Sequence, residues 1–122
     1  MTASRSEILR GHNQHHNPNY VRSSGLDASA QIVAHRLGRK DKGIAHAAKW
    51  WRIIDKMTKK RYGTEGENLA LDYDSANALM TAWMNSPLHK KNIVNPRFKY
   101  IGIGVALGRR TGRSYYVVHF GG

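Results

Sequence analysis

The fold is decided by residues 101–107, which read IGIGVAL. Their period of two is typical of a β-strand, in which alternate side chains point to opposite faces. One face would carry branched apolar residues and the other only glycine and alanine. We expect a helix or another backbone segment to lie close against the small-residue face. A valine at Gly102 or Gly104 should therefore clash with it, and overpacking of this kind typically costs about 1–3 kcal/mol.

A hairpin is predicted directly after this strand. The connection 108–112 reads GRRTG, and the next stretch, Ser114 to Phe120, is rich in aromatic and β-branched residues. Upstream, Thr64 to Leu71 has the character of a further short strand. These segments predict a small antiparallel sheet.

Helical segments fill most of the remaining chain, so the fold class is α+β, with helices packed on the sheet. Tryptophans fall at helical spacing within two of these segments, which favours a core role over a surface for stacking bases; they are Trp50, Trp51 and Trp83. Five helices are expected. The first begins at Ser4 or Ser6 and ends before Asn17-Pro18, the second follows Gly25 and stops at Gly38, and the third runs from about Ala47 to Lys60. The fourth starts at Asp74-Ser75 and the fifth runs from Ser86-Pro87 through Asn92, while Arg39 to Gly43 is expected as a charged loop.

Composition limits the possible classes of protein. The 122 residues suit one domain, so we expect residues 1–122 to form a single domain. No apolar run approaches the roughly 20 residues of a membrane span. The first seven residues contain no apolar segment, which predicts no signal peptide in this chain; whether one has been removed stays open. Cysteine is absent, so disulfides and thiolate ligands are excluded.

The chain is strongly basic, with a formal net charge of +12. Residues 75–122 contain seven Lys or Arg and no acid. Residues 36–61 contain ten Lys or Arg against Asp41 and Asp55. Such a charge favours polyanions such as nucleic acid, teichoic acid or anionic lipid. A solvated basic surface without a dedicated partner is the open alternative.

Three sequence strings occur in a characteristic order and spacing: GENLA at 66–70, WMNSPLHKKNI at 83–93 and IGIGVA at 101–106. A terminal YYVVHFG follows at 115–121. Together they resemble the bacterial, cysteine-free branch of the CAP (SCP-like) superfamily, which includes cysteine-rich secretory, antigen 5 and pathogenesis-related proteins. The resemblance covers about Leu26 to Gly121. It implies a three-layer α-β-α sandwich and an extracellular or cell-envelope location.

The same resemblance implies a surface cleft in which two histidines and two acids meet. Carried over to this chain, the histidines are His46 and His89, and one acid is Glu67. Ser86 occupies the position of the second acid, which removes a charge. His119 stands where related bacterial chains more often carry Gln.

Local chemistry supports a role for these residues. Glu67 shares its strand side with Glu65 and Leu69, and a carboxylate facing the core needs a partner, which the histidines could supply. Glu65 is expected to be solvated. His89 would lie in a first helical turn, where the helix dipole lowers the pKa and leaves a neutral imidazole. We expect His46, Glu67 and His89 to converge within hydrogen-bond or metal-ligand reach.

His46, Glu67 and His89 are therefore the candidate catalytic residues and the candidate ligands of Zn²⁺ or another divalent metal. Ser86 is expected as a helix N-cap and is the weaker candidate for a nucleophile. Three further histidines, His12, His15 and His16, suggest a mobile polar loop that could hold adventitious metal.

Three functions remain open. The favoured one is a binding module whose cleft takes a small ligand, a lipid or a cell-envelope component, with or without a divalent metal. The second is a metal-assisted or serine-type hydrolase of peptide or peptidoglycan, which the missing second acid disfavours; the His-Glu-x-x-His pattern of metalloproteases is absent. The third is a non-specific polyanion-binding protein. The sequence does not decide whether the protein is an enzyme.

Overall fold

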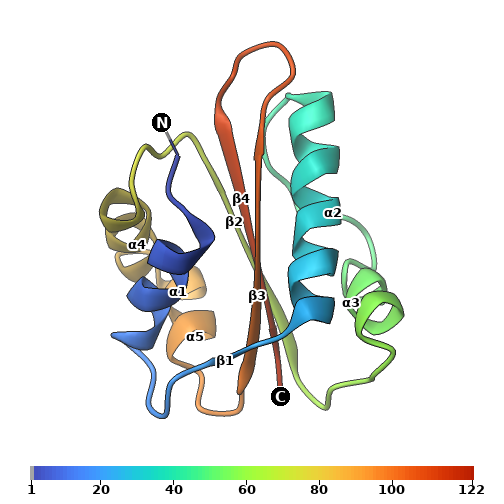
Figure 1. Cartoon of the computed structure of the whole chain (residues 1–122), viewed down its shortest axis with the longest axis vertical. Coiled ribbons are helices and arrows are strands. Elements are labelled where there is room, and N and C mark those ends of the chain that lie inside the picture. The colour runs from blue at the N-terminus through green and yellow to red at the C-terminus, as the bar shows by residue number, and fades with distance from the viewer. Residues whose placement is uncertain (1) are drawn as a thin grey trace.

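A four-stranded sheet lies between two layers of helices in the computed structural model, which describes residues 2–122 (Figure 1). Helices α2 (Ser24–Lys40) and α3 (Trp51–Thr58) cover one face of the sheet. Helices α1 (Arg5–Asn13), α4 (Ala76–Met84) and α5 (Pro87–Val94) cover the other. The α-β-α sandwich predicted from the sequence is confirmed.

The sheet has the strand order β1-β3-β4-β2. Its members are β1 (Val21–Arg22), β2 (Glu65–Leu71), β3 (Tyr100–Leu107) and β4 (Ser114–Gly121). Strand β4 pairs antiparallel with both β2 and β3, as the hairpin pattern predicts. Strand β1 adds a parallel pair with β3, which makes the sheet mixed. A two-residue strand is too short to show a period of two, so the sequence does not reveal it.

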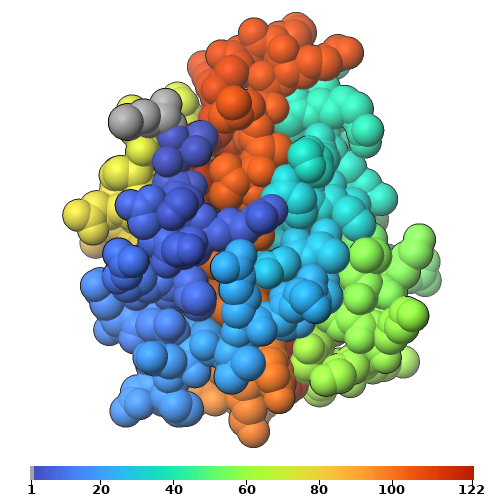
Figure 2. Space-filling model, in the orientation of Figure 1, coloured from blue at the N-terminus to red at the C-terminus, as the bar shows by residue number. Residues whose placement is uncertain are grey.

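The free edge of β3 is closed by side chains rather than by a further strand. The backbone N–H of Ile103 donates to Asp27 Oδ1 at 2.9 Å, and the N–H of Val105 donates to Gln31 Oε1 at 3.1 Å. The Arg5 guanidinium donates to the Ile103 carbonyl at 3.0 Å and also contacts Gln31. In Figure 2 the N-terminal segment accordingly meets α2 across β3. These contacts satisfy edge groups that could otherwise pair with another chain.

Helix α2 lies directly on the small-residue face of β3, as predicted. An ideal Cβ placed on Gly102 would overlap the backbone of Leu26 and Asp27. One placed on Gly104 would lie 2.5 Å from the carbonyl carbon of Ala30. The helix also presents small residues at this interface, since Ala30 and Ala34 are fully buried.

Helix α2 runs two residues beyond Gly38, where the sequence suggested a stop. Gly38 is needed for a close approach instead, because a Cβ there would lie 2.7 Å from the Leu107 carbonyl oxygen. The helix ends at Asp41, whose φ of 51° is left-handed. The predicted charged loop from Arg39 is therefore wrong at its start, since Arg39 and Lys40 are helical.

Asp41 is buried and joins the end of α2 to the β3–β4 hairpin. Its carboxylate accepts hydrogen bonds from the backbone N–H groups of Arg110 (2.9 Å) and Thr111 (2.7 Å) and from the hydroxyls of Thr111 and Tyr115 (2.9 Å each). The bond from the Thr111 N–H, with the other donors, holds the pKa of Asp41 well below its usual range. The hairpin is thereby fixed to the C-terminal end of α2.

Helix α3 is shorter than predicted, because it begins at Trp51 rather than Ala47. Lys49 has a left-handed φ of 53°, so the chain is not helical before Trp50, and the helix starts after it without a side-chain cap. The predicted core position of Trp51 is wrong, since this side chain is 41% exposed. Trp50 is half-buried, and only Trp83 lies in the core as predicted.

The histidines near the N-terminus do not form the mobile polar patch that the sequence suggested. Helix α1 is capped by Ser4 and continues to Asn13, which places His12 in the core with no exposed surface. His16 is buried, stacks on Tyr20, and has one ring nitrogen 2.7 Å from the Pro18 carbonyl and the other 3.0 Å from the Asn95 carbonyl. Packing of His12 against Trp83 of α4 and Phe120 of β4 overrides the polar local sequence.

None of the helices described between residues 2 and 122 has the length and apolar composition needed to cross a bilayer.

Candidate functional site

Glu67 is the centre of the candidate site. It lies on β2 with a side chain only 1% exposed. Its Oε1 is 2.6 Å from His46 Nδ1, and its Oε2 is 2.7 Å from His119 Nε2. Burial alone would raise the pKa of Glu67, but the hydrogen bonds and charges of His119 and His46 outweigh it and lower the pKa below its ordinary value. Glu67 is therefore an ionised carboxylate that accepts a hydrogen bond on each oxygen.

His119 is a partner of Glu67 that sequence reasoning missed. It lies on β4 directly opposite Glu67 and is completely buried. Its Nδ1 is 2.6 Å from the hydroxyl of Ser29 on α2, which is also completely buried. The signal that could have drawn attention to His119 is a polar residue in an otherwise apolar strand. Its position opposite Glu67 follows only from the pairing of β2 with β4, because the β3–β4 hairpin register pairs His119 with Gly102.

His46 is the exposed end of this hydrogen-bonded series. It lies in the loop before α3, and its side chain is 52% exposed. Nδ1 is bonded to Glu67, whereas Nε2 makes no hydrogen bond to any group within residues 2–122. The ring of Trp50 lies 6.4 Å from that of His46 and 6.5 Å from that of His119. Trp50 thus lies near both histidines that contact Glu67.

His89 lies in the first turn of α5, as predicted. Its Nδ1 is 2.8 Å from the Ser86 hydroxyl, and its ring stacks near Trp83 at 6.3 Å. The pKa of His89 is lowered, in the predicted direction, first by burial and then by the nearby charge of His46. Ser86 occupies the N-cap position, but its hydroxyl contacts the His89 ring instead of capping the helix.

The predicted triad is thus brought together in part. His46 and Glu67 are in direct contact, and His89 lies close enough for the charge of His46 to lower its pKa. His89 is bonded to Ser86 and makes no hydrogen bond to Glu67. Across residues 2–122, no three His, Asp or Glu side chains have the mutual spacing of a metal-ligand cluster.

A metal ion at this site would have to use the nitrogens that the hydrogen bonds leave free. Both oxygens of Glu67 already accept hydrogen bonds from imidazoles, which suits an orienting partner better than a ligand. The Nε2 atoms of His46 and His89 are the nitrogens left for an ion, because each Nδ1 is held by Glu67 or Ser86. Water or a bound ligand would have to complete the coordination.

Glu65 is not solvated as the sequence suggested. It is half-buried and faces Asp55 of α3, because α3 packs on this side of β2. Burial and the neighbouring Asp55 raise the pKa of Glu65 to about 7. Glu65 therefore belongs to a contact between α3 and the sheet, separate from Glu67 and its histidines.

Asn68 fixes α5 relative to β2. Its side chain is buried, donates to the His89 carbonyl at 3.1 Å and accepts from Asn92 at 2.8 Å. Asn92 also donates to the Glu67 carbonyl at 3.3 Å. The strand that holds Glu67 and the helix that holds His89 are thus joined by two amide side chains.

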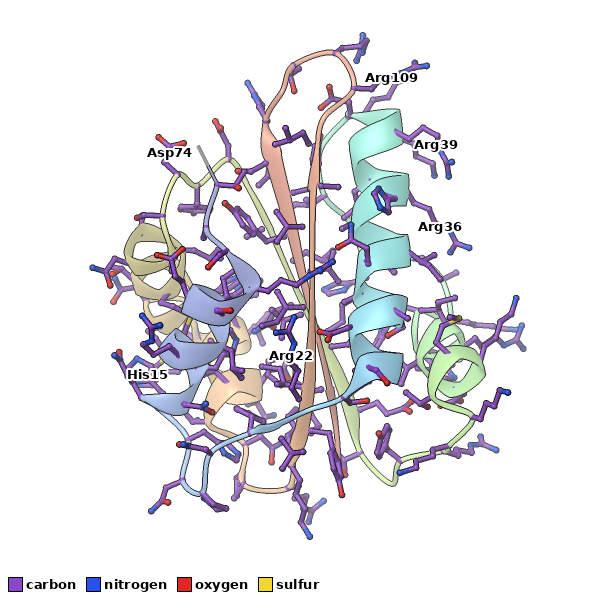
Figure 3. The ribbon with its side chains drawn as sticks, viewed as in Figure 1. His15, Arg22, Arg36, Arg39, Asp74 and Arg109 are labelled. Atoms are coloured by element: carbon purple, nitrogen blue, oxygen red, sulfur yellow. The ribbon has the colours of Figure 1, made fainter. Side chains whose placement is uncertain are left out.

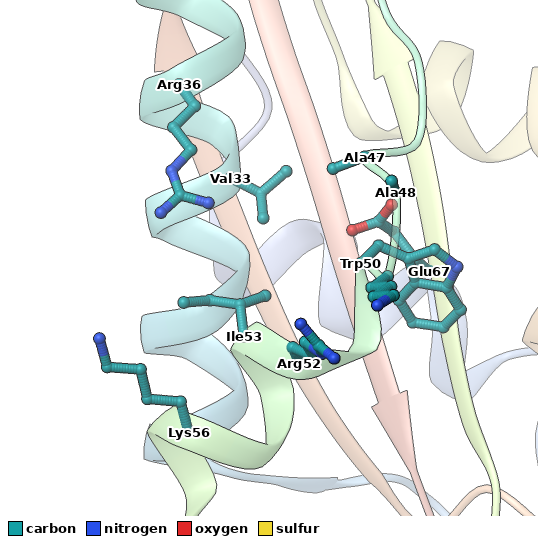
Figure 4. Close-up of a pocket in the computed structure, with 10 residues that line it drawn as sticks. Val33, Arg36, Ala47, Ala48, Trp50, Arg52, Ile53, Lys56 and Glu67 are labelled. Atoms are coloured by element: carbon teal, nitrogen blue, oxygen red, sulfur yellow. The ribbon is translucent and has the colours of Figure 1, made fainter.

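A hollow of about 330 Å³ opens beside Glu67, and a second hollow of about 350 Å³ adjoins it and is lined by His46. Val33, Arg36 and Ala47 line both hollows, so the two adjoin across these residues. Figure 4 shows the first hollow, with Glu67 and Trp50 on one side and Arg36 and Lys56 on the other. The further lining residues are Ala48, Lys49, Arg52 and Ile53 in the first hollow, and Leu37, Lys40, Lys42, Gly43, Ile44, Ala45 and His46 in the second.

Comparison with known proteins places these features in one family. The model of the cysteine-rich secretory protein family, CAP, matches residues 8–120. Among curated relatives, the uncharacterized protein YkwD of Bacillus subtilis is 49% identical over 43 residues, which are 35% of this chain and 17% of YkwD. The matched part is thus well under two thirds of that relative's length.

Solved structures share the fold over nearly the whole chain. An outer surface protein of Borrelia burgdorferi is 27% identical, with a TM-score of 0.77 over 95% of this chain and 86% of that one. An extracellular protein with an SCP domain from Bacillus anthracis is 19% identical, with a TM-score of 0.73 over 95% of this chain and 39% of that one.

Proposed function

The chain belongs to the CAP family of cysteine-rich secretory proteins, and from this we propose that it is a binding protein whose cleft takes a small anionic ligand or part of a cell-envelope component. We propose further that His46, which lines the second hollow, holds a divalent metal together with His89. The observation that carries the proposal is that both histidines have Nδ1 fixed by a partner and Nε2 left free. Neutral imidazole is a common metal ligand, and such partners orient it.

The cleft lining supports an anionic ligand. Arg36, Lys49, Arg52 and Lys56 line the hollow beside Glu67, and that carboxylate is already matched by two imidazoles. Val33, Ile53 and Trp50 offer apolar surface between the cations. A ligand with a negative group and an apolar body would use both features. An extracellular or cell-envelope location is proposed with it, since CAP relatives include an outer surface protein and an extracellular protein.

A serine-type hydrolase is the second candidate. The observation that favours it is the 2.8 Å contact between Ser86 and His89, which has the distance of a nucleophile and its base. The described residues give His89 no carboxylate on its other nitrogen to orient it, and Ser86 stands where relatives place an acid. Binding is therefore proposed ahead of hydrolysis. Turnover of a peptide or peptidoglycan substrate that is lost in Ser86→Ala would reverse this order.

Zn²⁺ is expected to bind weakly at neutral pH and to be released in acid, because protonated imidazoles cannot coordinate a metal. The double variant His46→Ala with His89→Ala should abolish binding. Isothermal titration with Zn²⁺ alone at pH 7.5 and pH 5.5 measures both effects. His15→Ala, which removes an exposed histidine elsewhere, is the matched control and should bind as the unmodified chain does.

Retention of Zn²⁺ affinity in the double variant would place the metal site elsewhere and end the metal part of the proposal. The N-terminal histidines are poor alternatives, because His12 is fully buried and both ring nitrogens of His16 face carbonyl oxygens.

A third candidate, non-specific polyanion binding, is favoured by a group of basic residues at the hairpin end of the molecule. Arg109 lies in the β3–β4 hairpin loop near the C-terminal end of α2, where Arg39 is exposed, and Arg36 is exposed further back along the same helix (Figure 3). Arg110 and Arg113 belong to the same loop, which Asp41 fixes to the helix. Such a surface attracts polyanions by charge and reads no base edges.

Changing Arg109, Arg110 and Arg113 to Glu should weaken binding to all polyanions together and leave Zn²⁺ binding intact. Gel shifts across a salt series, with two unrelated DNA sequences and one acidic polysaccharide, measure this. Affinity should fall steeply with salt, because binding releases counterions and the Debye length is only about 8 Å at physiological ionic strength. Salt-resistant binding to a single DNA sequence would contradict the non-specific interpretation.

A further inference from the structure

We propose that Ser29 and His119 are positioning residues, which hold Glu67 as the fixed anionic partner of His46 and so direct the free Nε2 of His46 into the cleft. The proposal rests on the function proposed above, because it concerns the histidine that the cleft would use. It is carried by four side chains in hydrogen-bonded series: Ser29, His119, Glu67 and His46.

The series runs from the interior to the surface. Ser29 and His119 have no exposed surface, the Glu67 side chain is 1% exposed, and the His46 side chain is 52% exposed. A buried carboxylate is costly unless its oxygens are hydrogen-bonded. The two oxygens of Glu67 have separate imidazole partners, so loss of His119 would leave Oε2 buried and unmatched.

Three elements hold the interior part in one geometry. Ser29 comes from α2, His119 from β4 and Glu67 from β2. Contact with Ser29 fixes Nδ1 of His119, which aims Nε2 at Glu67. Glu67 and His119 also face each other directly in the β2–β4 ladder. The carboxylate therefore has little freedom to rotate away from His46.

The protons of the series are consistent with this role. The Ser29 hydroxyl lies 2.6 Å from His119 Nδ1 and 3.0 Å from the Leu26 carbonyl, so it can donate to either one. If it donates to Nδ1, His119 is neutral with its proton on Nε2. If it donates to Leu26, its oxygen accepts from Nδ1–H of a doubly protonated His119. In both cases an Nε2–H faces Glu67, and the carboxylate stays anionic.

The consequence appears at His46. Because Glu67 Oε1 accepts a hydrogen bond from Nδ1–H, neutral His46 is held as the Nδ1–H tautomer. The lone pair then lies on Nε2, which has no hydrogen-bond partner among residues 2–122. A carboxylate behind an imidazole fixes its tautomer and strengthens it as a metal ligand, and loss of such a partner typically lowers metal affinity about 10–100-fold.

The test measures the tautomer of His46 and the affinity for Zn²⁺ in the full chain. Nitrogen-15 NMR of the imidazoles distinguishes Nδ1–H from Nε2–H, and His46→Ala assigns the signals. The variants are His119→Leu, which removes both hydrogen bonds, Ser29→Ala, and the conservative His119→Gln, whose amide can still donate to Glu67 and accept from Ser29.

In the unmodified chain His46 should be mainly the Nδ1–H tautomer at neutral pH. His119→Leu should lose that tautomer preference and bind Zn²⁺ about tenfold or more weakly. Ser29→Ala should change the tautomer preference and the Zn²⁺ affinity in the same direction. His119→Gln should keep both as they are in the unmodified chain. An unchanged tautomer in a folded His119→Leu variant would overturn the proposal. If that variant does not fold, an unchanged tautomer in Ser29→Ala overturns it.

The two proposals fail differently. If the unmodified chain does not bind Zn²⁺ but the tautomer still responds to His119→Leu, the positioning role is supported and the metal function is lost. If Zn²⁺ binds but neither the tautomer nor the affinity responds to Ser29→Ala and His119→Leu, the metal function stands and the positioning role is overturned.

Discussion

Gly102→Ala and Gly104→Ala are each expected to prevent stable folding or to lower the melting temperature by about 15 °C or more. A Cβ on Gly102 would overlap the backbone of Leu26 and Asp27, and one on Gly104 would lie 2.5 Å from the Ala30 carbonyl carbon. Backbone atoms of a helix cannot rotate aside as side chains can. All of α2 would have to move off the sheet.

Such a movement would separate more than the two atoms in contact. Asp27 would lose the N–H of Ile103, and the buried surface of Ala30 would open. Ser29 would also be drawn away from His119. The penalty should therefore exceed the roughly 1–3 kcal/mol of ordinary overpacking that the sequence alone suggests.

Thermal unfolding followed by circular dichroism measures this effect. Gly63→Ala is the matched control, because a Cβ there would meet nothing closer than 3.8 Å and its melting temperature should hardly change. If Gly102→Ala and Gly104→Ala both had the melting temperature of the Gly63→Ala control, α2 would not lie on β3 as described.

The sheet and its helical cover could be predicted from the sequence because their patterns are local. The alternation in 101–107 shows both the strand and the face on which α2 lies. Helix ends were predicted less well, because tertiary contacts decide them. Helix α2 continues through Gly38, because the nearby Leu107 carbonyl leaves room only for a small residue there. Helix α3 starts late because Lys49 has a left-handed backbone conformation.

The candidate site was predictable only as far as its motifs reach. Glu67, His46 and His89 follow from strings that resemble a family, and the structure puts two of them in contact. Ser29 and His119 are 90 residues apart in sequence and meet only because α2 lies on the glycine face of β3. Nothing in the local sequence of Ser29 distinguishes it from an ordinary helix residue.

Acid is expected to destabilise the protein through His12, by about 3 kcal/mol between pH 6.5 and pH 4. His12 has no exposed surface and lies among Tyr20, Trp83 and Phe120. Its Nδ1 is 2.8 Å from the Ile8 carbonyl, and its Nε2 has no hydrogen-bond partner. Burial lowers the pKa of His12 to about 4. A proton on Nε2 would place an unmatched charge in an aromatic core.

The sign follows from the two states. Below pH 6.5 the unfolded chain binds a proton at this histidine, whereas the folded chain does not until about pH 4. Stability is therefore lost as pH falls through this window, and His12 contributes no further loss below it. Glu65 acts in the opposite direction, because its pKa is raised to about 7 and the folded state takes up its proton first. Its half-buried position reduces that offset.

Urea unfolding at pH 7, 6, 5 and 4 distinguishes the contribution of His12 to the pH dependence of stability from that of Glu65. His12→Phe keeps a ring among Tyr20, Trp83 and Phe120 but cannot titrate, so its stability should fall about 3 kcal/mol less than that of the unmodified chain from pH 6.5 to pH 4. Glu65→Gln should lose stability with falling pH more steeply than the unmodified chain does. The comparison uses slopes, so a constant loss of stability in either variant does not affect it. Parallel pH curves for His12→Phe and the unmodified chain would show that His12 is not the acid-sensitive group.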